Sequence, residues 1–224
     1  ENLRAFLRKI ALFDQLKSYS QALKATREAL KQHSEQVQLK MLEINFSILS
    51  GQLNTAQIAI NNLAPETRNT SKIKLLQGRV DVLNGNFKAA EPNLLMGYTD
   101  FPTRVNAILV FDNYIKLKQG DKAVQFIHKH LDTNPTDVIV LSKLGDYQMF
   151  TAPQKAIQTY KRLIDINKDN IIALNNIAWL FVESGDKDSA LSYSQKAVTL
   201  NPNISEIQDT YGQALLLNGR TEEA

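Results

Sequence analysis

The chain has 224 residues, and its 26 basic and 23 acidic side chains leave a net charge of +3. That balance is too even for the basic footprint of a nucleic-acid-binding protein. The chain has no cysteine, which excludes disulfides and thiolate metal sites, and it has no apolar run long enough to span a membrane.

Alanine recurs along the sequence at nearly constant spacing. The intervals are 34, 34, 33, 33, 34 and 34 residues, and the positions are Ala22, Ala56, Ala90, Ala123, Ala156, Ala190 and Ala224. A fixed period of this length is typical of stacked repeat proteins. A small side chain on this period also indicates close helix packing, because a methyl group leaves room where leucine would not.

The period divides the chain into six full repeats and a partial one, each full repeat predicted to be two helices joined by tight turns. The boundaries are 3–36, 37–70, 71–104, 105–137, 138–170, 171–204 and 205–224. In the third repeat, Pro92 and Gly97 fall in the second helix, so we expect that helix to start late or kink. In the fifth repeat, Pro153 fits the first position of its helix.

The best-preserved repeat is 171–204. Its first helix carries an apolar face at Leu174, Ile177, Ala178 and Phe181. Gly185-Asp186 then predicts a helix stop, with Asp186 starting the next helix. A second apolar set follows, and Asn201-Pro202 ends the second helix.

These features resemble the tetratricopeptide repeat (TPR) family, whose pattern runs W-x2-LG-x2-Y, then A-x3-F, then P. The residues that carry the resemblance are Leu174, Ile177, Ala178, Phe181, Ala190 and Pro202, with Leu141, Leu144, Gly145 and Tyr160 one repeat earlier and Tyr211 and Gly212 one repeat later. The resemblance covers essentially the whole chain. It implies an all-α TPR solenoid, a right-handed superhelix of antiparallel helix pairs, as a single array over residues 1–224. Because the chain starts without Met and stops where a second helix is predicted, we expect a fragment of a longer protein.

Catalytic and metal-binding patterns are absent from the sequence. The histidines are His33, His128 and His130, and the last two lie two residues apart on a predicted helix, where they point in different directions. We expect them to be surface or partly buried side chains near a helix end. There is no phosphate loop, nucleophile elbow or glycine-rich nucleotide turn. We therefore expect no enzyme activity, no cofactor and no metal.

The family resemblance implies a concave groove lined by the first helix of each repeat. Carried onto this sequence, the groove candidates are Asp112, Asp146, Met149, Asn175, Asn176, Trp179, Glu183, Asp209 and Gln213. Trp179 could anchor a partner or pack against the neighbouring helix. Asn175 and Asn176 could bind a ligand backbone or each other.

Acidic candidates in this groove predict a protein or peptide partner that is basic or neutral and polar, with an apolar anchor. The same acids argue against an RNA-binding helical repeat. The basic clamp of co-chaperone TPR members and the asparagine ladder of glycosyltransferase-linked members are both missing, since the relevant positions hold Glu206, Lys143 and Thr210.

The amino-acid sequence of residues 173–180 and 209–212 is similar to that of the bacterial TPR lipoprotein of the exosortase (PEP-CTERM) sorting and exopolysaccharide system. That resemblance implies a scaffold in the bacterial envelope or periplasm, with the cytoplasm left open. The function expected is therefore a non-catalytic interaction scaffold. The alternative is a recruiting domain of a larger enzyme, such as a glycan-processing one.

Overall fold

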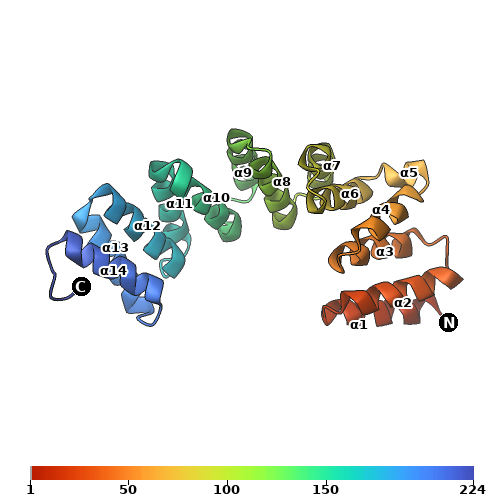
Figure 1. The fold of residues 1–224 in the computed structure, drawn as a ribbon, viewed down its shortest axis with the longest axis horizontal. Helices are drawn as coiled ribbons and strands as arrows, with labels where there is room; N and C mark the ends of the chain where they lie inside the picture. Colours follow the sequence, from red (N-terminus) through yellow and green to blue (C-terminus); the bar gives the residue numbers. More distant parts are fainter. Residues whose placement is uncertain (1) are drawn as a thin grey trace. The chain divides into compact units, whose positions relative to one another are not determined.

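A computed structural model of the chain describes residues 2–224 (Figure 1), and these residues form fourteen α-helices and no β-strand. The helices are α1 (Leu3–Gln15), α2 (Tyr19–Gln32), α3 (Val37–Leu49), α4 (Leu53–Asn61), α5 (Pro65–Arg68), α6 (Ser71–Leu83), α7 (Phe87–Asp100), α8 (Arg104–Lys116), α9 (Gly120–Thr133), α10 (Val138–Thr151), α11 (Pro153–Ile166), α12 (Ile171–Ser184), α13 (Lys187–Leu200) and α14 (Ser205–Leu217). The expected all-α fold of consecutive helix pairs is confirmed.

The chain divides into two compact units, one up to Ala123 and one from Val124 to Ala224, and the boundary falls within α9. In the N-terminal unit, α1 packs on α2, α2 on α3, α3 on α4, and α6 on α7. In the C-terminal unit, α10 packs on α11, α12 on α13, and α14 on both α12 and α13. Each helix therefore buries its apolar side against near neighbours in the sequence.

Six of the seven periodic alanines are completely buried, with 0% of their surface exposed. They are Ala22, Ala56, Ala90, Ala123, Ala156 and Ala190. Ala224 is the exception, because it is exposed and α14 ends earlier, at Leu217. The prediction that Ala224 lies in the first turns of a further helix is therefore wrong.

The turns follow the sequence signals closely. Gly185 ends α12 with φ of 75°, a left-handed conformation that glycine adopts without steric cost. Asp186 then starts α13, because its side chain accepts a hydrogen bond from the Ser189 backbone N–H at 3.1 Å. Pro153 is the first residue of α11, as predicted.

The second helices of the second and third repeats differ from the expected pattern. Helix α7 begins at Phe87 and carries Pro92 in its interior, so the predicted late start is wrong, and the alternative, a kink, stays a prediction. A break that the sequence analysis did not predict lies in the second repeat, where α4 has only nine residues and Pro65 begins the short helix α5. Arg68 compensates for the early end of α4, because its Nη2 donates to the carbonyls of Asn61 and Leu63 at 2.7 and 2.8 Å.

Candidate functional site

The candidate residues of the C-terminal unit lie on the first helix of each pair, which is α10, α12 or α14. Asn175, Trp179 and Glu183 follow one another at four-residue steps along α12, so they share one side of that helix. The neighbouring residues Leu174, Ile177 and Ala178 are buried, so they form its packed side. We call the side of α10, α12 and α14 that carries Asp146, Trp179 and Gln213 the inner face.

An aromatic pair joins two helices of the inner face. The rings of Phe150 on α10 and Trp179 on α12 have centroids 6.5 Å apart and are tilted by 54°. Phe150 is 79% exposed and Trp179 is half-buried. The Trp179 ring thus packs against the neighbouring helix and still reaches solvent, and its role as an anchor for a partner stays a prediction.

Sequence reasoning missed Phe150 as a candidate. The signal was present, since Phe150 lies four residues after Asp146 and therefore on the same side of α10. However, Phe150 is a large apolar residue next to Met149, and such a residue is more often buried than exposed. Three further large apolar side chains of these helices are well exposed: Ile139 at 49%, Ile172 at 64% and Leu216 at 55%.

A buried tyrosine fixes two of the polar candidates. The Tyr160 hydroxyl donates a hydrogen bond to Asp146 Oδ1 at 2.9 Å and accepts one from Asn176 Nδ2 at 3.1 Å. The Tyr160 ring is fully buried against Gly145, where an added Cβ would lie 2.8 Å from ring atom Cε1. Burial, and next the charge of Asp146, raise the pKa of Tyr160 well above its ordinary value. Tyr160 therefore links α10, α11 and α12.

Asn175 differs from its neighbour Asn176. Its Oδ1 atom is buried and has no hydrogen-bond partner among residues 2–224. The described residues include no bond between Asn175 and Asn176, because the Asn176 amide is engaged by Tyr160. Because this acceptor is shielded from solvent, a ligand donor reaches it only after the Asn175 side chain, one helical turn before Trp179, changes its rotamer.

The remaining candidates are scattered over the two units. On α14, Gln213 Nε2 donates to Asp209 Oδ2 at 2.8 Å. Glu183 is exposed and Met149 is half-buried. Asp112 is half-buried on α8 and belongs to the N-terminal unit, whereas the other eight candidates belong to the C-terminal unit.

A cleft of about 970 Å³ in the C-terminal unit is lined mainly by residues of α11, of α13 and of the turn after α11. None of the nine candidates lines it. Its walls carry mixed charge, with Asp165, Asp169 and Asp188 beside Lys168 and Lys196. The second helices therefore offer an alternative to the inner face as a binding surface, but neither sign of charge dominates there.

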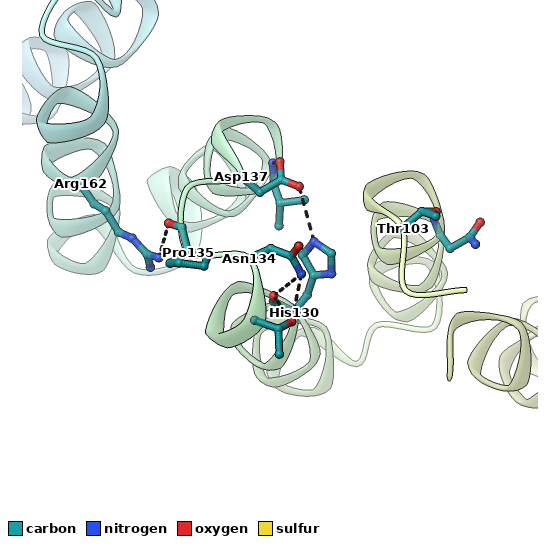
Figure 2. A network of polar contacts seen from close by, with 9 residues as sticks. Thr103, His130, Asn134, Pro135, Asp137 and Arg162 are labelled. Carbon is teal, nitrogen blue, oxygen red and sulfur yellow. Dashed lines mark hydrogen bonds and ion pairs between the residues drawn. The ribbon is translucent and has the colours of Figure 1, made fainter. Parts of the chain in front are cut away.

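A polar network at the start of α10 includes one of the histidines (Figure 2). His130 is 1% exposed, and its Nε2 lies 3.5 Å from Asp137 Oδ2. Asp137 also caps α10, since its Oδ1 accepts from the Val140 N–H at 3.2 Å. Arg162 of α11 donates to the Pro135 carbonyl in the same turn. The prediction of a surface or partly buried histidine is wrong for His130, which is a structural residue.

Within residues 2–224, the structure places no three His, Cys, Asp or Glu side chains where they could hold a metal ion. In the same part of the sequence, no helix combines the length and the apolar character needed to cross a bilayer.

Comparisons with known proteins agree with this architecture. Residues 171–204 match the family model described as tetratricopeptide repeat. No curated protein sequence matches the chain.

Solved structures similar to this chain include PilF of Pseudomonas aeruginosa, at 18% identity and a TM-score of 0.65, covering 92% of this chain and 95% of PilF. YrrB, described as a TPR protein with an unusual peptide-binding site, matches at 15% identity and a TM-score of 0.62 over 84% of this chain and 97% of YrrB. MamA matches at 19% identity and a TM-score of 0.58 over 69% of this chain and 85% of MamA. At these identities the likeness concerns the fold.

Proposed function

Since residues 171–204 are a tetratricopeptide repeat and the chain has the fold of TPR proteins, we propose that it is a non-catalytic interaction scaffold. The inner face of the C-terminal unit binds an extended segment of a protein partner. The segment is basic or neutral and polar, and it carries one apolar anchor. YrrB is a precedent for peptide binding on this fold.

The observation that carries the proposal is the Phe150–Trp179 pair. A phenylalanine that is 79% exposed costs free energy in water, because large apolar side chains gain from burial. Aromatic side chains are also the residues that most often dominate binding energy at interfaces. A partner side chain that packs on this pair removes both rings from water.

Charge and amide chemistry around the pair define the rest of the segment. Glu183 lies one turn after Trp179, and Asp146 lies one turn before Phe150, so carboxylates flank the aromatic pair. These acids attract a basic segment and mainly raise its association rate. A change of rotamer at Asn175 brings its unused Oδ1 to the inner face, where it accepts a hydrogen bond from a backbone N–H of the bound segment.

The test begins with a probe obtained independently of any known partner. A random peptide library displayed on phage is selected on the immobilised full-length protein, and the selected peptide is measured by surface-plasmon resonance at two salt concentrations. We expect Trp179→Ala to weaken binding by about 1–3 kcal/mol, mostly through faster dissociation. Glu183→Lys with Asp209→Lys should instead slow association and flatten its salt dependence.

The matched control lies in the cleft between α11 and α13. Gln195→Ala changes a residue of that cleft and should leave binding unchanged. If Gln195→Ala removes binding while Trp179→Ala retains it, the working surface lies on the second helices and the inner-face proposal is wrong.

For the biological setting, we propose a bacterial envelope, protein-sorting or exopolysaccharide system. The support is the resemblance of the sequence of residues 173–180 to the bacterial TPR lipoprotein. The alternative is a recruiting domain of a larger enzyme. The full reading frame of the gene distinguishes them. A lipobox cysteine upstream supports the envelope scaffold, and a catalytic domain in the same reading frame supports the enzyme.

A further inference from the structure

The tripeptide Leu-Asn-Gly occurs twice in the chain, and each copy lies at the C-terminal end of a first helix. Residues 83–85 end α6 and residues 217–219 end α14. Asn84 and Asn218 are the C-cap residues, with φ and ψ of −85° and 0° at the first and −87° and 2° at the second. The glycines that follow have φ of 77° and 75°. The two turns therefore share one sequence and one backbone conformation.

The backbone hydrogen bonds of the two turns match as well. The Gly85 N–H donates to the Val82 carbonyl at 3.0 Å, and the Gly219 N–H donates to the Leu216 carbonyl at 2.9 Å. In each turn the next residue donates to the carbonyl five residues earlier, at 2.8 Å after Gly85 and at 3.0 Å after Gly219. A Cβ added to either glycine would meet nothing within 4 Å, so both turns are open to water.

The two asparagine side chains have different surroundings. Asn218 is half-buried, and its Nδ2 donates to the carbonyls of Lys187 on α13 and Ala214 on α14, both at 2.9 Å. Asn84 is exposed, and its side chain makes no hydrogen bond with another residue in the range 2–224. The Asn218 amide is therefore held in place, whereas the Asn84 amide changes rotamer without breaking a hydrogen bond.

An Asn-Gly pair contains both reacting groups of an intramolecular reaction. The glycine backbone nitrogen gives up its proton to water or hydroxide and attacks the asparagine Cγ. A bond forms between these two atoms, the bond from Cγ to the side-chain nitrogen breaks, and ammonia leaves with a proton from the solvent. Glycine favours this step because no side chain shields its nitrogen. Water then opens the cyclic imide at one of its two carbonyl carbons, which gives aspartate or isoaspartate.

We propose that Asn84 is a site of spontaneous modification in the folded protein, through the cyclic imide formed with Gly85, and that Asn218 is protected. Both reactions require the glycine N–H to leave its carbonyl acceptor, and this local opening is common to the matched turns. Asn218 must in addition break its two side-chain hydrogen bonds. Two bonds of ordinary strength make the reaction at Asn218 slower by at least about fivefold.

The products change the joint between α6 and α7. An aspartate places a negative charge at the C-terminal end of α6, where the helix dipole disfavours it. An isoaspartate leads the main chain through the former side chain and lengthens it by one methylene group. The bond from the Asn86 N–H to the Asp81 carbonyl, 2.8 Å long, spans this joint and is disrupted by the added length. The modification therefore weakens the α6–α7 pair as the protein ages.

The test follows both asparagines in the full-length protein at mildly alkaline pH, in native buffer and in urea. Peptide mapping by mass spectrometry measures the loss of each amide, and chromatography separates isoaspartate from aspartate. In urea we expect similar rates, because Asn84 and Asn218 have the same neighbours on both sides. In native buffer we expect Asn84 to react at least about fivefold faster, after division by the ratio in urea. Fraying near the chain end would favour Asn218 instead, so it cannot produce this result.

Two variants assign the reaction to Asn84. Asn84→Gln moves the amide one methylene group away, so closure on the Gly85 nitrogen needs a larger ring, and the reaction of this segment should disappear. Asn86→Gln is the matched control, since Asn86 is also exposed but precedes Phe87, and it should retain the wild-type rate at Asn84. After ageing, the urea midpoint of the wild type should fall, whereas that of Asn84→Gln should stay constant.

Equal native rates at the two asparagines overturn the proposal, and so does a faster reaction at Asn218, because side-chain hydrogen bonds then do not decide the reactivity. Modification of the segment that persists in Asn84→Gln also overturns it. If Asn84→Gln does not fold, the comparison within the wild-type protein decides by itself. A midpoint that stays constant after Asn84 has reacted contradicts the weakening of the α6–α7 pair.

Discussion

The backbone of Gly97 in α7 lies so close to Leu75 in α6 that a Cβ atom added at Gly97 would be 2.6 Å from the Leu75 Cβ. The same Cβ would lie 3.2 Å from the Leu75 Cα, so it would clash with backbone as well as side-chain atoms of Leu75. Gly97 is therefore the residue that allows these two helices to cross closely, and its low helix propensity is offset by that contact.

We expect Gly97→Ala to destabilise the fold by about 1–3 kcal/mol, because α6 and α7 must separate to admit the methyl group. The measurement is urea denaturation followed by circular dichroism. Gly212→Ala in α14 is the matched control, since nothing lies within 4 Å of its added Cβ. That control should be neutral or stabilising by up to about 1 kcal/mol. Equal losses for the two variants would show that the close crossing is not the cause.

The alanine period offers a second matched pair. Ala156 is completely buried, whereas Ala224 has the same place in the sequence period and is exposed. We expect Ala156→Leu to cost on the order of 1–3 kcal/mol by overpacking, and Ala224→Leu to change stability by less than about 0.5 kcal/mol. Melting temperatures of the two variants provide the measurement. Similar losses at both positions would contradict the assigned packing.

Tyr160 predicts a dependence of stability on alkaline pH. Its pKa is raised in the folded protein, whereas an unfolded tyrosine titrates at about 10. Above that pH the unfolded state releases the phenolic proton while the folded state retains it, so stability falls as pH rises. Tyr160→Phe should flatten this fall. Urea midpoints at several pH values from about 8 to about 11 give the slope directly.

The same variant isolates the hydrogen bonds at neutral pH. Tyr160→Phe removes the donor to Asp146 and the acceptor of Asn176, at a cost of about 0.5–1.5 kcal/mol. Asp146→Asn retains an acceptor but removes the charge that helps to raise the Tyr160 pKa. It should reduce the alkaline slope without abolishing it. An unchanged slope in both variants would mean that another group causes the alkaline loss.

Asp137 and Asp186 allow the His130 contact to be separated from helix capping. Both side chains cap a helix, accepting from Val140 N at 3.2 Å and from Ser189 N at 3.1 Å. We expect Asp186→Ala to cost about 1 kcal/mol. Asp137→Ala should cost at least about 1 kcal/mol more, because it also removes the carboxylate facing buried His130. Denaturation midpoints of the two variants in one buffer provide the comparison, and equal costs would rule out a contribution from His130.

The sequence predicted buried positions and helix starts correctly where one local contact requires one type of residue. The alanine period predicted the buried positions because only a small side chain fits where two helices cross, and Asp186 was correctly assigned as a helix start. The first inference needed only the spacing from one repeat to the next, and the second needed only the residues of one turn.

Features that depend on partners in a neighbouring helix could not be predicted in the same way. His130 lies seven residues after Ala123 and three after Ile127, both buried, so its spacing favours the packed side of α9. Its partner Asp137 lies beyond the end of that helix, where spacing within the helix gives no information. The position of Phe150 could be placed on its side of α10, but its contact with Trp179 on α12 depends on how the two helices lie. The Arg79 guanidinium on α6 donates to Asn45 on α3, one repeat earlier, and no spacing within one repeat indicates that contact.

The Arg79–Asn45 bond joins residues 34 apart, which is one repeat length, and the helix contacts within each unit reach at most three helices along the sequence. Such a fold has a low contact order, and helical proteins of this kind fold in about microseconds to milliseconds. Ribosomes add about 5–20 residues per second, so one repeat takes roughly 2–7 s to synthesise. Each helix pair therefore has ample time to dock on the preceding pair before the next one leaves the ribosome. We therefore expect assembly to follow the order of synthesis, so that apolar helix faces stay exposed in the nascent polypeptide only briefly.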